Sequence, residues 1–116
     1  MKIVLDCNVL ISASVNDGTC RQVFRKAIEG HQLFFSQQIA DEYLETITKL
    51  KFKKETAEEF YKLVSTLFAN ANVIEPLPCN VQLLDKDDEI YLAVALTAKA
   101  DVLITGDKKH VTITKG

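Results

Sequence analysis

The stretch IVLDCN, residues 3–8, joins a short apolar run directly to an acid. Its first three residues have the apolar character of a buried strand in a parallel sheet. Asp6 and Asn8 follow where this strand should end. Ligands of open parallel sheets bind beyond the carboxyl ends of the strands, whereas an Asp in this position is also a good helix cap. Asp6 is therefore predicted to be either a cap or part of a functional site.

Apolar runs and amphipathic segments alternate along the rest of the chain. The apolar runs predict further strands at residues 32–36, 72–78, 101–107 and, at an edge of the sheet, 110–114. Helical spacing predicts a helix that starts at residues 9–13, one that ends at Gly30, and helices over 37–50, 54–71 and 85–100. This alternation predicts an α/β fold with a mainly parallel sheet. The apolar face of the segment 54–71 is predicted to consist of Ala57, Phe60, Tyr61, Val64, Leu67, Phe68 and Ala71.

Length, cysteine content and charge limit the possible classes of protein. The 116 residues predict a single domain, 1–116. No signal peptide or membrane-spanning run is recognised, so we expect a cytoplasmic protein. The three cysteines form no CxxC pair, which argues against a zinc site and a disulfide framework. A net charge of −2 argues against a broad basic nucleic-acid interface but allows nucleic acid to be held at an acidic, metal-filled site.

A second strand is also predicted to end in an aspartate. Asp107 follows the apolar run VLIT as Asp6 follows the first strand. In a parallel sheet both carboxylates would emerge at the same edge. One such residue is best explained as a helix cap, but two of them favour a site.

The segment 37–50 contains three acids, of which one lies next to the apolar face. Ile39, Tyr43, Ile47 and Leu50 define that face. Glu42 falls at its boundary, whereas Asp41 and Glu45 are expected to face solvent.

Four more acids lie at the start of the helix predicted at 85–100. These acids (Asp85, Asp87, Asp88 and Glu89) have an ordinary explanation, since negative charge stabilises a helix N-terminus. Periodicity does not choose between Asp87 and Asp88 as a site residue. Several carboxylates that converge on one pocket would need cations between them, and such oxygen ligands suit Mg²⁺ or Mn²⁺.

Three stretches resemble the PIN domain family: VLDCNVLIS (4–12), SQQIADEYLETI (36–47) and DKDDEIYLAVALTAKADVLITGD (85–107). Within that family the chain is most similar to the small prokaryotic VapC-like toxins of toxin–antitoxin pairs. The resemblance implies a PIN-like three-layer α/β/α fold around a mainly parallel sheet. Relatives usually continue with a further strand and helix, so we expect that C-terminal strand and helix to be missing here.

Residue by residue, the resemblance implies a site of four acids that hold the metal and carry out catalysis: Asp6, Glu42, Asp88 and Asp107. It implies that Asn8, Ser36 and Thr105 orient these carboxylates. Cys7 stands where the family usually has Thr.

The resemblance further implies a hydrolase, a Mg²⁺- or Mn²⁺-dependent endoribonuclease whose partners are RNA, an antitoxin protein and a second copy in a homodimer. The competing hypothesis is a degenerate PIN module that binds a partner protein without catalysis. Substrate contacts would have to come from local basic clusters, each of which is ordinarily just a solvated face. The candidate clusters are Arg21, Arg25 and Lys26; Lys49, Lys51, Lys53 and Lys54; and Lys108 with Lys109.

Overall fold

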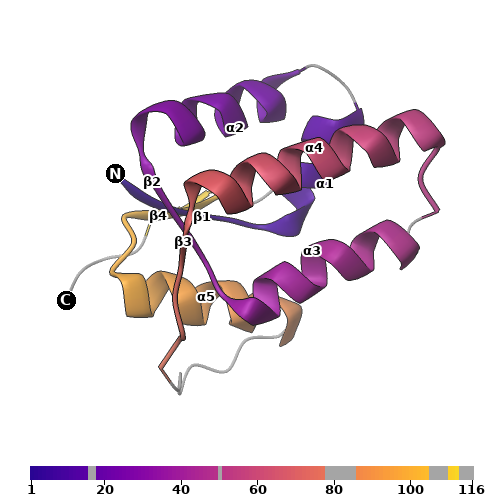
Figure 1. Cartoon of the computed structure of the whole chain (residues 1–116). Coiled ribbons are helices and arrows are strands. Elements are labelled where there is room, and N and C mark those ends of the chain that lie inside the picture. Colours follow the sequence, from indigo (N-terminus) through magenta and orange to yellow (C-terminus); the bar gives the residue numbers. More distant parts are fainter. Residues whose placement is uncertain (16–17, 50, 78–85, 105–109, 113–116) are drawn as a thin grey trace.

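The computed structural model describes residues 1–15, 18–49, 51–77, 86–104 and 110–112, of which 86–88 and 110–112 are described by their backbone alone. One or two helices separate successive strands from β1 to β4 (Figure 1). The elements are β1 (Lys2–Leu5), α1 (Cys7–Val15), α2 (Thr19–Gly30), β2 (Gln32–Phe35), α3 (Gln37–Lys49), α4 (Lys54–Asn70), β3 (Asn72–Val73), α5 (Lys86–Ala98), β4 (Val102–Ile104) and β5 (His110–Thr112).

The five described strands form one sheet in the order β3-β2-β1-β4-β5. β1 pairs in parallel with both β2 and β4, and β2 pairs in parallel with β3. β5 pairs antiparallel with β4 at the edge. The mainly parallel sheet and the edge position of the last strand are therefore confirmed.

Helices cover both faces of this sheet, which gives the predicted three layers. α5 packs on one face against β1, β2 and β4, whereas α1, α2 and α4 pack together on the other (Figure 1). α3 packs against both α4 and α5. None of the described helices has the length and apolar composition that crossing a membrane requires.

The predicted apolar face of α4 is confirmed except at one residue. Phe60, Leu63, Val64 and Leu67 are its buried side chains. Tyr61 is 53% exposed, so its assignment to the core was wrong. Tyr61 is displaced by roughly 100° from the centre of this stripe, whereas Leu63, which the sequence pattern omitted, lies within it.

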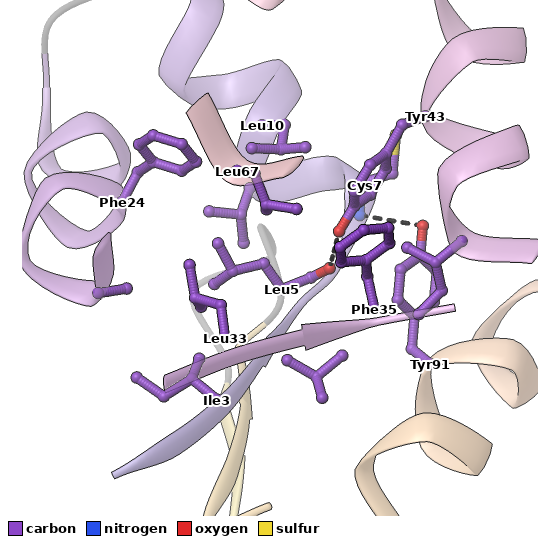
Figure 2. Packing of buried hydrophobic residues seen from close by; sticks show 14 of the residues in the cluster. Ile3, Leu5, Cys7, Leu10, Phe24, Leu33, Phe35, Tyr43, Leu67 and Tyr91 are labelled. Carbon is purple, nitrogen blue, oxygen red and sulfur yellow. Dashed lines mark hydrogen bonds between the residues drawn. The ribbon is translucent and has the colours of Figure 1, made fainter. Parts of the chain in front are cut away.

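Two buried tyrosines hold the end of β1 from different helices. The hydroxyl of Tyr43 in α3 donates to the carbonyl oxygen of Leu5 at 2.6 Å. The hydroxyl of Tyr91 in α5 accepts a hydrogen bond from the backbone N–H of Cys7 at 3.2 Å (Figure 2). The two rings also face each other at a centroid distance of 6.4 Å. The backbone on both sides of Asp6 is thus fixed by side chains from two helices.

Candidate functional site

Asp6 leaves the carboxyl end of β1 and begins α1. Its backbone N–H donates to the carbonyl of Ile104 at 3.0 Å, which continues the pairing of β1 with β4. Its Oδ1 accepts a hydrogen bond from the N–H of Asn8 at 3.2 Å, so the carboxylate caps the helix. The side chain is only 7% exposed. A carboxylate has about four acceptor positions, so a carboxylate that caps a helix can also be a metal ligand.

Glu42 lies half-buried on α3, at the boundary of the core as predicted. It lines a cavity of about 390 Å³ together with Cys7 and Asn8, the two residues that follow Asp6. Asp41 and Glu45 are exposed, as predicted, but they line the same cavity, which the helical pattern did not indicate. The wall of this cavity is therefore more acidic than the sequence suggested.

Hydrogen bonds that the sequence did not predict connect Cys7, next to Asp6, with the turn of α3 that contains Glu42. The Sγ of Cys7 lies 3.1 Å from the Oγ1 of Thr46. Thr46 Oγ1 donates its own proton to the carbonyl oxygen of Glu42 at 2.8 Å. Since a hydroxyl has one proton, the Cys7 thiol must be the donor in the first contact. The only sequence signal was the spacing of Thr46, one helical turn after Glu42.

The electrostatic environment connects Asp6 with Glu42. Burial is the main reason that the pKa of the Cys7 thiol is raised to about 11; the negative charges of Glu42 and Asp6 contribute to this rise, and the hydrogen bond with Thr46 opposes it. Burial likewise raises the pKa of Tyr43 and of Tyr91, and both carboxylates add to each shift. Both acids therefore act on the same three side chains.

Ser36 begins α3 and is almost fully buried. Its Oγ accepts a hydrogen bond from the N–H of Ile39 at 3.2 Å, and its carbonyl accepts one from Ala40 at 2.9 Å, which caps the helix. Ser36 lines a second cavity of about 570 Å³, whose wall includes Val73 and Glu75. It does not line the Glu42 cavity, so its role in orienting a carboxylate stays a prediction.

The other predicted site residues fall outside the part of the chain whose side chains are described. Asp88 belongs to α5 by its backbone, while Thr105 and Asp107 lie outside the described residues. The choice between Asp87 and Asp88 stays a prediction for the same reason. Among the described residues, no group of three His, Cys, Asp or Glu side chains is arranged to hold a metal ion. Two of the four predicted acids, Asp6 and Glu42, are thus placed by the structure.

Comparisons with known proteins give the family. Residues 2–109 match the family model of the PIN domain. No curated protein matches the chain. Its fold is similar to the crystal structure of VapBC2 from Rickettsia felis bound to a DNA fragment from their promoter, with a TM-score of 0.58 and 13% identity over 86% of this chain and 84% of that one. Because the family match spans most of its length, the chain belongs to the PIN domain family.

Proposed function

We propose that this chain is a metal-dependent endoribonuclease and the toxin of a toxin–antitoxin pair. PIN domains are generally metal-dependent nucleases, which are hydrolases. The solved structure of similar fold is a VapBC complex, which supports an antitoxin as the protein partner. RNA as substrate, a homodimer and action in the cytoplasm belong to the same proposal.

The observation that supports the proposal best is that Asp6 and Glu42 both act on Cys7. A buried carboxylate at the end of β1 and a half-buried one on α3 both act on the thiol of Cys7. Two carboxylates that share one environment repel each other, and a divalent cation relieves that repulsion. Oxygen donors of this kind suit Mg²⁺ or Mn²⁺. The donor chemistry of the described residues therefore fits such an ion.

Asp6, Asp88 and Asp107 would hold the metal, with Glu42 completing the set. When bound, the ion would polarise the scissile phosphate and lower the pKa of an attacking water. Asp6 is suited to a fixed ligand because its helix cap and the two tyrosines restrict its movement. Asn8, Ser36 and Thr105 would orient the carboxylates.

Glu42 would accept a proton from the attacking water, as its position on the cavity wall allows. The water oxygen forms a bond to phosphorus while the bond from phosphorus to the 3′ oxygen breaks. The leaving 3′ oxygen takes up a proton, so the products are a 5′-phosphate and a 3′-hydroxyl. Atoms and charges balance with water as the only co-reactant.

The test compares Glu42→Gln with Glu45→Gln on a labelled single-stranded RNA, in Mn²⁺ and in excess EDTA. Both glutamates lie on α3 and line the same cavity, so the two variants are matched in charge and position. We expect cleavage by the parent in Mn²⁺, none in EDTA, and a loss of about 100-fold or more for Glu42→Gln alone. A parent that binds a partner protein but cleaves no RNA would instead support the degenerate PIN module.

A further inference from the structure

The cavity beside Glu42 continues along one face of α3. Its α3 wall includes Gln38, Asp41, Glu42, Glu45 and Lys49, each of which lies three or four residues from another member of the set. Such spacing places them on one side of the helix. The opposite wall comes from α1, at Cys7, Asn8 and Ile11. The groove therefore extends from Glu42 to the C-terminal end of α3, a distance of about 10 Å between Glu42 and Lys49.

The charge along this groove changes sign toward that end. Asp41 accepts a hydrogen bond from Gln37 at 2.9 Å, and the charge of Glu45 is partly offset by Lys49 at 3.5 Å. Beyond Lys49 the chain presents three further exposed lysines, which with it form the lysine cluster: Lys49, Lys51, Lys53 and Lys54. This local excess of positive charge contrasts with the net charge of −2.

Lys51 also has an unusual backbone conformation. Lys51 has φ 43°, in the left-handed region that favours glycine. Lys99, which follows α5, has the same kind of backbone with φ 56°. The helix dipole stabilises a positive charge near the C-terminus of a helix, which explains in part why a lysine occupies each of these positions. Lys99 is therefore a control that matches Lys51 in backbone geometry and in its relation to a helix end.

Arg21, in the first of the other candidate clusters, already has partners within the protein. Arg21 donates from Nε to the carbonyl of Ala13 at 2.9 Å and lies 3.7 Å from Glu59, so it joins α2 to α1 and α4. Lys108 and Lys109 lie outside the described residues. Of the two candidate clusters within the described part of the chain, the lysine cluster is the one with a member, Lys49, in the wall of the Glu42 cavity.

We propose that the lysine cluster binds backbone phosphates of single-stranded RNA whose scissile bond lies beside Glu42, an inference that rests on the proposed function. The strand follows the groove along α3, and phosphates on one side of the scissile bond reach the lysines. Each lysine that neutralises a phosphate releases counterions, so it strengthens binding in a salt-dependent way without taking part in the chemistry. The lysine cluster then lowers KM and leaves kcat unchanged.

The experiment compares two triple variants of equal charge. K51Q/K53Q/K54Q removes three members of the lysine cluster, and K26Q/K62Q/K99Q removes three exposed lysines elsewhere. Each lowers the net charge by three, so the long-range field changes equally in both. KM and kcat are measured in Mn²⁺ on a single-stranded RNA of about 20 nucleotides, at salt from about 50 to 200 mM.

We expect the lysine-cluster variant to raise KM by about 10-fold or more at low salt and to reduce the log–log salt slope by about 2. Its kcat should stay within about twofold of the parent, and the control triple should change KM by less than about threefold. Equal KM values for the two triples would overturn the inference and leave the proposed function standing. A parent without RNA cleavage would overturn the proposed function, and the inference with it.

Discussion

The thiol of Cys7 lies 3.1 Å from the hydroxyl of Thr46, and this contact joins the β1–α1 junction to the middle of α3. Because Thr46 also donates to the carbonyl of Glu42, the link reaches the turn that holds the proposed base. Both groups are buried and neutral, so they connect Asp6 and Glu42 without adding charge to an acidic site.

Thr46→Val should break this link. The thiol of Cys7 then loses its acceptor inside the protein, and we expect the free energy of unfolding to fall by about 1 kcal/mol. Thr48→Val is the matched control, because the exposed Thr48 makes the same kind of bond to the carbonyl of Glu45. Urea denaturation of both variants measures the difference. Equal stability of the two would contradict a structural role for the contact.

Tyr91→Phe should lower the free energy of unfolding more than Thr46→Val does. It removes the acceptor of the Cys7 N–H, and a buried N–H without a partner costs about 1–3 kcal/mol. Tyr61→Phe is the control, since that ring is 53% exposed. Thermal and urea denaturation should show a clear loss for Tyr91→Phe and almost none for Tyr61→Phe; the reverse order would argue against the contact.

Alkaline pH should lower the free energy of unfolding, because the Cys7 thiol has a higher pKa in the folded state than in the unfolded state. Its folded pKa of about 11 is above the reference value of 9.0, so the unfolded chain loses the thiol proton first as pH rises. The folded state then binds more protons than the unfolded state, and the free energy of unfolding falls between these two values by up to about 1.4 kcal/mol per pH unit. Well below pH 9.0 this thiol is protonated in both states and has no effect on stability.

Cys7→Ser removes that titration, because a serine hydroxyl stays protonated in this range. Urea denaturation at stepped pH should therefore give a shallower alkaline decline for Cys7→Ser than for the parent. The tyrosines Tyr43 and Tyr91, whose pKa values are also raised by burial, maintain a decline at higher pH in both proteins. Identical slopes just above pH 9.0 would contradict the raised thiol pKa.

Two adjacent acids in α5 provide a direct test of the site assignment. Asp88→Asn should abolish RNA cleavage, whereas Asp87→Asn should keep most of it, because the family resemblance assigns the metal ligand to Asp88. The two substitutions make the same charge change one residue apart in the same helix. Cleavage assays in Mn²⁺ separate them. Loss of activity in Asp87→Asn alone would mean that the assignment is wrong by one residue.

Patterns in the sequence were sufficient for the order of elements, because apolar periodicity reports directly which faces are buried. They were less accurate at element ends. α1 begins at Cys7 rather than near residue 9, since Asp6 caps it, and the strand expected at 72–78 spans only Asn72–Val73. Pro76 lacks the N–H that a longer ladder would need there.

The candidate site was harder to predict than the fold. Glu42 was correctly placed at the edge of the core because its environment depends on one helix. The contacts of Cys7 with Thr46 and Tyr91 involve three separate helices, so no local pattern indicates them. The acidic cavity wall at Asp41 and Glu45 also depends on where α1 packs, which helical periodicity does not report.

The most direct test of the metal site is the effect of Mn²⁺ on the melting temperature of Asp6→Asn. Asparagine caps a helix about as well as aspartate, so the cap to Asn8 should survive and stability without metal should equal or exceed that of the parent. A metal bound to the folded state raises the melting temperature of the parent and of the exposed control Asp41→Asn. We expect Asp6→Asn to lose that increase. An increase equal to the parent's would leave Asp6 as a helix cap and contradict the metal-dependent nuclease.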